Sequence, residues 1–278
     1  MIQFINLSEI LREQYPELAK KLPNWVVFII KKIIKQDKMN FYINKYKNEI
    51  GVDFTSKMIS ELNLKIEIEG IENLPESGRC IFVANHVFGI LDGMILGNIV
   101  GKKYGSFIGI GNDAFLLIPQ LASTVTSVNV YGKCDRKQLV ELDKIYKSDI
   151  PINDFPAGEV SRVYKGKIQD CEWRKTFVSK AITEKREIVP VFFHGRNSIL
   201  FYLVFRLRKA LGIKANIELM LLPGEFFRKR NASIKITIGK SVHYSRLDGK
   251  LNHLKTALRI RNLVYSLKDN PDSLPDFN

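Results

Sequence analysis

Hydrophobic and polar positions follow two different rhythms along this 278-residue chain. Up to residue 62, apolar residues recur every three or four positions, which predicts helices over residues 7–22, 24–38 and 41–62, the last range holding one helix or two. From residue 64 onward, short apolar runs alternate with helix-like segments. We therefore predict an N-terminal helical, membrane-associating region over residues 1–62 and an α/β domain over residues 63–278.

The second part of the chain predicts a layered α/β fold. Strand-like runs occupy residues 65–68, 79–84, 105–108, 126–130, 151–155, 187–193 and 233–238. Helical periodicity covers residues 91–100, 114–121, 136–146, 174–183, 199–211 and 249–266. This alternation favours a mainly parallel sheet covered by helices on both faces, with ligands bound beyond the carboxyl ends of the strands.

Composition narrows the class of protein. A hydrophobic content of 45% is typical of a folded chain. The three cysteines show neither paired nor metal-ligand spacing, which favours a reducing compartment and gives no support for a metal site. The N-terminus lacks a basic region followed by a cleavage site, so we expect no secretory signal. No apolar run approaches the roughly 18 to 20 residues that span a bilayer.

The net charge of +14 requires an acidic partner, either nucleic acid or an anionic lipid surface. No nucleic-acid motif is present, so we expect no nucleic acid and favour the membrane. On a helical wheel of residues 24–38, Trp25 and Ile29 share an apolar face, whereas Lys31 and Lys35 lie opposite. This pattern predicts a helix lying in the membrane interface, and the alternative is a helix docked on the core.

The sequence NHVFGILD at residues 85–92 carries the first candidate chemistry. His86 leaves a predicted strand, and Asp92 follows six residues later at a predicted helix start. A carboxylate that holds one imidazole nitrogen leaves the other nitrogen free to take a proton from a hydroxyl group. The pair therefore predicts a general base with its orienting residue.

Two later segments complete the pattern. DFPAGEVSR at residues 154–162 follows a predicted strand, and IVPVFFHGRNS spans residues 188–198. With the His-x5-Asp segment, they resemble the glycerolipid acyltransferase superfamily, which includes lysophosphatidic acid acyltransferase. The likeness covers about residues 60–245. It is nearer to the bacterial branch of hemolysin-related proteins and ornithine- or glycine-lipid O-acyltransferases, whose third motif reads Phe-Pro-Ala-Gly-Glu-x-Ser-Arg.

The resemblance implies an enzyme without a cofactor that moves an acyl group to a lyso-lipid hydroxyl. The donor would be acyl carrier protein or coenzyme A thioester, and the enzyme would be peripheral on the cytoplasmic face of a bacterial inner membrane. His86 and Asp92 would be catalytic. The substrate would contact the third motif, through Phe155, Pro156, Gly158, Glu159, Ser161 and Arg162. Asn85, His194 and Arg196 are possible pocket residues.

One departure from the better-known branch bears on the acceptor. Glu159 follows the glycine, whereas that branch places glutamate before it, so its phosphate-binding role does not transfer. We therefore expect a lyso-ornithine or lyso-glycine lipid as acceptor, with lysophosphatidic acid as the alternative. A non-catalytic membrane-binding relative and a soluble thioester hydrolase are the other hypotheses. An intact His86–Asp92 pair argues against the first, and an interfacial helix against the second.

Overall fold

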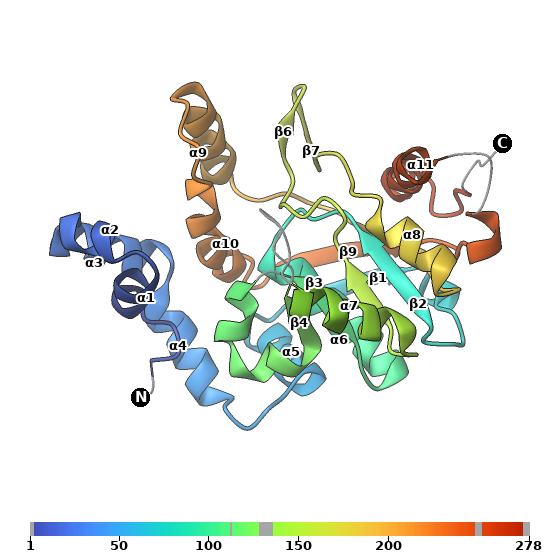
Figure 1. Cartoon of the computed structure of the whole chain (residues 1–278), viewed down its shortest axis with the longest axis horizontal. Helices are drawn as coiled ribbons and strands as arrows, with labels where there is room; N and C mark the ends of the chain where they lie inside the picture. Colours follow the sequence, from blue (N-terminus) through green and yellow to red (C-terminus); the bar gives the residue numbers. More distant parts are fainter. Residues whose placement is uncertain (1–2, 112, 128–135, 248–251, 275–278) are drawn as a thin grey trace.

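A seven-stranded sheet forms the centre of the computed structural model, which describes residues 3–111, 113–127, 136–247 and 252–274 (Figure 1). Its order is β1 (Lys65–Glu69), β9 (Ser233–Ile238), β8 (Glu187–Phe193), β2 (Cys80–Ala84), β5 (Ile152–Asp154), β3 (Ile108–Gly111) and β4 (Val125–Ser127). All neighbours are parallel except β8 and β9. The mainly parallel sheet is thus confirmed.

The pleat of β2 separates two hydrophobic layers. Phe82 packs in the cluster that holds α5 (Val52–Glu61) and α6 (Ile90–Tyr104), whereas Ile81 and Val83 pack in the cluster on the other face. That second cluster holds residues of α7 (Arg136–Lys147), α8 (Thr176–Thr183) and α11 (His253–Ser266). Alternate side chains of a strand point to opposite faces, so a strand as apolar as β2 requires helices on both.

The N-terminal helices are shorter than predicted. Pro16 divides the first into α1 (Leu7–Gln14) and α2 (Pro16–Lys21), because proline is accommodated only in the first turn of a helix. The second ends early, as α3 (Asn24–Ile33), since Lys35 adopts a left-handed conformation with φ of 54° before α4 (Gln36–Lys45) begins. Lys35 therefore lies at a break and not on the polar face of α3.

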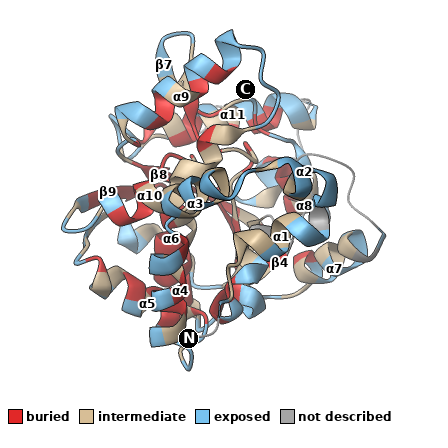
Figure 2. Ribbon diagram, turned by 90° about the vertical axis from the view of Figure 1, so that its left-hand side faces the viewer, coloured by how far each residue is buried: buried red, intermediate tan, exposed pale blue. Residues whose placement is uncertain are grey.

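The predicted boundary at residue 62 falls inside one continuous core. Tyr42 and Ile43 of α4 and Phe54 and Met58 of α5 belong to the same hydrophobic cluster as the sheet. By contrast, α3 contains no buried residue. In Figure 2, α1, α2 and α3 lie in front of the red core as tan and pale-blue ribbon.

Several other boundaries differ from the sequence expectation. β3 begins at Ile108 instead of residue 105, and the helix expected over 114–121 is a pair of 3-10 helices, Asp113–Leu117 and Pro119–Thr124. Pro119 disfavours α-helical geometry at the residue before it, which interrupts the expected helix. The hairpin of β6 (Arg162–Tyr164) and β7 (Lys167–Gln169), and α10 (Leu222–Arg228), were not predicted. Predicted residues 128–130 and 249–251 lie outside the described residues.

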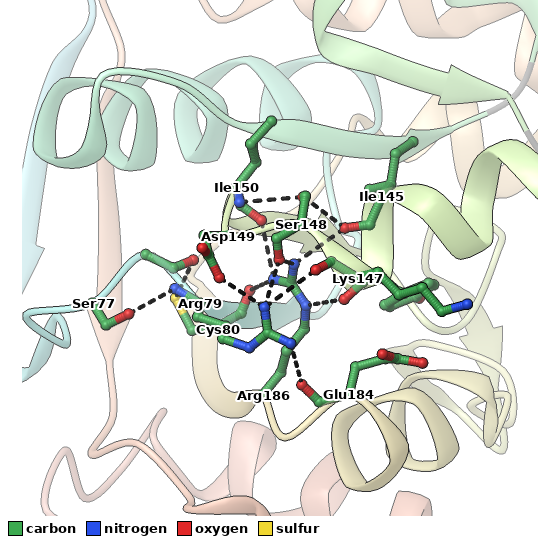
Figure 3. A network of polar contacts seen from close by, with 12 residues as sticks. Ser77, Arg79, Cys80, Ile145, Lys147, Ser148, Asp149, Ile150, Glu184 and Arg186 are labelled. Carbon is green, nitrogen blue, oxygen red and sulfur yellow. Dashed lines mark hydrogen bonds and ion pairs between the residues drawn. The ribbon is translucent and has the colours of Figure 1, made fainter.

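One fully buried cation fixes the end of the sheet opposite the carboxyl ends of the strands (Figure 3). The Arg186 guanidinium donates to the carbonyls of Tyr146 at 2.8 Å, Ile150 at 3.0 Å, Ile145 at 3.1 Å and Cys80 at 3.2 Å, and also to that of Ser148. These acceptors come from the end of α7, the turn into β5 and the start of β2. Arg186 thereby holds together the two strands that carry the candidate motifs.

We predict that Arg186→Met lowers the free energy of unfolding by about 3 kcal/mol or more, because buried carbonyls lose their donors. Arg79→Met is the matched control. Its guanidinium is partly exposed and contacts the same segment, at Ser148 and Asp149, so its loss should cost about 1 kcal/mol. Urea unfolding measures both, and equal losses would contradict the structural importance of Arg186.

Candidate active site

His86 and Asp92 meet where β2 leads into α6. His86 Nδ1 lies 3.0 Å from Asp92 Oδ2, and this same oxygen accepts the backbone N–H groups of Phe88 at 2.8 Å and Gly89 at 3.0 Å. Gly89 caps the helix with φ of 80°, a conformation that favours glycine. The tight turn and the helix start therefore fix the carboxylate before any substrate binds.

The surroundings of the pair favour one tautomer of the imidazole. Asp92 is fully buried, and burial raises the pKa of its carboxyl, while the hydrogen bond from His86 acts in the opposite direction. When Nδ1 donates to Asp92, Nε2 is the nitrogen that accepts a proton. The His86 side chain is 17% exposed and its ring stacks on Phe155 at 4.3 Å between centroids. The pair has the geometry of an oriented general base.

The loop after β5 lies directly against this pair. Phe155 C=O accepts the N–H of Gly158 at 2.8 Å, which closes a tight turn with Gly158 at φ of 67°. The N–H of Ser161 donates to the carbonyl of His86 at 2.6 Å. The structure thus brings together two segments that lie about 70 residues apart in the sequence.

Asp170 supports both segments and was not identified from the sequence. Its carboxylate accepts the backbone N–H of His86 at 3.2 Å, the hydroxyl of Ser161 at 2.5 Å and the indole N–H of Trp173 at 2.9 Å. Burial raises the pKa of this carboxyl, and the hydrogen bonds from Ser161 and Trp173 oppose that shift. Ser161 is fully buried in this network, which makes its hydroxyl a structural donor.

Arg162 does not line the cavity that opens beside His86. Its guanidinium is fully buried, donates to Glu218 at 3.1 Å and lies over the ring of Phe201 at 5.0 Å. Arg208 binds the same carboxylate, with Nε 2.9 Å from Oε2. The ion pair of Arg162 in the described part of the chain is thus with Glu218 and not with Glu159 of the same motif. Arg162 therefore joins the loop to α9 (Ile199–Ala210) and to the 3-10 helix η4 (Ile217–Leu221).

The three possible pocket residues do not line the cavity. Asn85 is buried and exchanges two hydrogen bonds with the backbone of Phe193, at 2.7 and 3.0 Å, which ties β2 to β8. His194 bonds Thr237 at 2.9 Å, and burial lowers the pKa of its imidazole. Arg196 is exposed, and its carbonyl accepts a hydrogen bond from Lys229.

A cavity of about 290 Å³ opens beside His86. Most of its lining is apolar and comes from both sides of the sheet edge, including Met94, Phe107, Leu121, Leu139, Leu142 and Phe177. Phe155, Pro156 and Gly158 line it as well, whereas Glu159, Ser161 and Arg162 do not. A mainly apolar cavity with a base in its wall suits a hydrocarbon chain that carries a reactive polar end.

Among the described residues, the charged side chains that line the cavity are Asp154 and Arg174. Burial raises the pKa of Asp154 to about 7, against the opposing influence of Arg174. Arg174 Cζ lies 3.3 Å from the position that a Cβ atom at Gly158 would take, so the glycine makes room for the guanidinium. Sequence analysis missed Arg174, which stands outside the motifs. No group of three or more potential metal-ligating side chains occurs among the described residues.

The raised pKa of Asp154 predicts a pH-dependent stability. The folded chain holds a proton on this carboxyl that the unfolded chain releases near pH 3.8, so the free energy of unfolding falls as pH rises through about 7. Asp154→Asn should therefore melt higher than the parent protein at pH 8, and the gain should shrink toward pH 4. Thermal unfolding at several pH values measures this, and a gain independent of pH would contradict the assignment.

Comparison with known proteins agrees with this architecture. A family model described as acyltransferase matches residues 9–273. A lyso-glycine lipid O-acyltransferase of Bacteroides thetaiotaomicron is 38% identical over 264 residues, covering 95% of this chain and 97% of the relative. A protein of the same name from Phocaeicola vulgatus is 38% identical over 267 residues, covering 96% of each.

A solved structure shares the fold. The crystal structure of the 1-acyl-sn-glycerophosphate (LPA) acyltransferase PlsC from Thermotoga maritima matches with a TM-score of 0.51 and 17% identity, over 95% of this chain and 86% of that one. At this identity the likeness concerns the fold alone. The match of the family model along nearly the whole chain, together with the two full-length relatives, shows that the protein belongs to the acyltransferase family.

Proposed function

We propose that this O-acyltransferase esterifies the hydroxyl of a lyso-glycine lipid at an anionic membrane surface. The observation that carries the proposal is the oriented His86–Asp92 pair in the wall of an apolar cavity. The two relatives at 38% identity support the acceptor class by their names. The donor is an acyl thioester, on acyl carrier protein or coenzyme A, since a thioester is already activated for transfer.

The proposed reaction proceeds without an acyl-enzyme. His86 Nε2 takes the proton of the acceptor hydroxyl as its oxygen attacks the thioester carbonyl carbon. The tetrahedral intermediate collapses, the carbon–sulfur bond breaks, and the imidazolium returns the proton to the leaving thiolate. Asp92 stabilises the imidazolium throughout. Ser161 is no candidate nucleophile, because its buried hydroxyl donates to Asp170.

Arg174 is the proposed contact for the acceptor headgroup. Glycine linked to an acyl chain through its amide keeps a free carboxylate, and a guanidinium binds carboxylate through two parallel hydrogen bonds. Among the described residues, Arg174 is the arginine that lines the cavity, and Arg162 does not line it. The proposed acceptor thus lies with its chain in the apolar cavity and its carboxylate at Arg174.

Membrane contact is proposed through α3. Trp25, Phe28 and Ile29 are between 46% and 66% exposed, and the next residues along the helix include Lys31 and Lys32. This exposure favours the interfacial helix over the alternative of a helix docked on the core, because its apolar side chains face outward. Among the helices that the structure describes, none has the length and apolarity to cross a bilayer. Thioester donors place the reaction on the cytoplasmic face.

Acyl transfer by the purified protein tests the mechanism. His86→Ala should lower kcat by about a hundred-fold or more, since a positioned base contributes at least that much. Asp92→Asn should lower kcat strongly while leaving KM nearly unchanged. Asparagine does not enforce the tautomer in which Nδ1 carries the proton and Nε2 is the base. Full activity of His86→Ala would end the proposal. Product formation is followed by mass spectrometry with lyso-glycine lipid, lyso-ornithine lipid, lysophosphatidic acid and water as competing acceptors.

A headgroup comparison tests Arg174. Arg174→Ala should raise the KM for lyso-glycine lipid by about tenfold or more, the effect of losing a charge-assisted contact. With an acceptor whose carboxylate is replaced by an amide, the parent protein and Arg174→Ala should have similar KM values. Arg196→Ala, an exposed arginine outside the cavity, is the control and should change neither. A similar loss on both acceptors would show that Arg174 supports the fold and not the headgroup.

A further inference from the structure

Helix α9 carries an apolar stripe on its outer face. Ile199, Leu203 and Leu207, with Leu211 just beyond the helix end, recur every four residues and are between 54% and 67% exposed. The inner face of the same helix is already packed, because Phe201 and Phe205 are buried against the body of the protein. A surface helix ordinarily turns polar residues outward, so apolar residues on both faces indicate a second apolar environment.

The charge around this stripe indicates what that environment is. Arg206, Lys209 and Lys214 are exposed within or beside it, and residues 199–217 contain no acidic residue. The same holds for α3, which has two lysines and no carboxylate among its ten residues. Apolar side chains flanked by cations complement the interface of an anionic bilayer, where basic residues meet lipid headgroups.

The stripe lies at the same end of the molecule as α3. η4 contacts both α3 and α9, so the three segments are continuous. In Figure 1, α9 and α1–α3 occupy the left-hand side, with α11 and the C-terminus on the right. Figure 2, viewed from that left-hand side, shows α3 in front with α9 above it. The helices α3 and α9 therefore lie at one end of the molecule and are linked there by η4.

We infer that α9 is a second membrane-docking element, which binds an anionic bilayer together with α3. Two contact sites fix the orientation of the protein on the surface, whereas one helix leaves it free to rotate. The inner face of α9 packs on Arg162, which belongs to the loop that lines the catalytic cavity. Docking α9 therefore brings the surface close to that loop. This inference rests on the proposed membrane-surface function.

Vesicle binding by matched leucine variants tests the inference. Leu203→Asp with Leu207→Asp alters the α9 stripe. Leu254→Asp with Leu258→Asp is the control, because these leucines of α11 are 55% and 54% exposed with the same spacing, on the opposite side of the molecule. Trp25→Asp with Ile29→Asp reports on α3. Each protein is sedimented with vesicles of phosphatidylglycerol and phosphatidylethanolamine in equal parts, and circular dichroism verifies that it is folded.

The α9 variant should partition about tenfold or more weakly than the parent protein, from the loss of two buried leucine contacts. The α11 control should bind like the parent. Equal binding of the α9 and α11 variants would overturn the inference while leaving the function of α3 intact. Absence of binding by the parent protein would instead remove the membrane-surface function itself.

Two further outcomes would assign the stripe to another occupant and overturn the inference. In the first, the parent protein is a dimer in size-exclusion chromatography and Leu203→Asp with Leu207→Asp makes it monomeric, with vesicle binding unchanged. In the second, the same variant raises the KM for an acyl carrier protein thioester but not for the coenzyme A thioester, again with unchanged vesicle binding. The acidic carrier protein would then be the partner of α9.

Discussion

The chemistry proposed for this protein depends on one oxygen atom, Oδ2 of Asp92. It receives three N–H groups at once, from the His86 ring and from the backbones of Phe88 and Gly89. The two backbone donors come from the residues that immediately precede α6, and Asp92 itself lies in the first turn of that helix. Formation of the helix start therefore also orients the imidazole. The pair therefore requires the sheet to hold β2 and the helix start in register, and several other buried polar groups support that arrangement.

Three further buried charges fasten the elements around this pair. Arg186 joins the starts of β2 and β5, Asp170 joins the backbone of His86 to Ser161, and Glu218 joins Arg162 to Arg208. A buried ion is expensive to desolvate, and hydrophobic replacements of similar shape are often no less stable. Such groups instead specify geometry, because each tolerates only a few arrangements of its hydrogen-bond partners. In this protein these charges fix the segment that leads from β2 into α6 and the segment after β5, and both segments line the active-site cavity.

Sequence patterns predicted the features that depend on residues close together along the chain. The apolar runs of β2 and β8 required a sheet covered on both faces, and the six-residue spacing of His86 and Asp92 suited a strand followed by a helix start. Arg162 could not be placed in this way. Its guanidinium looks like a substrate contact in the sequence, and only the non-local approach of Glu218, 56 residues later, buries it. Arg174 and Asp170 escaped detection for the same reason, since their positions follow from tertiary packing.

The difference between local sequence pattern and tertiary packing also explains the exposed apolar faces of α3 and α9. Periodicity identified an apolar face on residues 24–38, but whether that face packs inward or remains exposed depends on which surfaces the sheet leaves open. The core is completed by Tyr42, Phe54 and other residues of α4 and α5, so α3 finds no apolar surface to bury. For α9, Phe201 and Phe205 already pack on the Arg162 side, and the leucines on the opposite face are left outside. The exposed apolar side chains of α3 and α9 therefore lie at the end where the helices of the N-terminal region leave the sheet. The acceptor proposed for the apolar cavity and Arg174 is a lipid, which would come from a bilayer, and this is the end proposed to meet it.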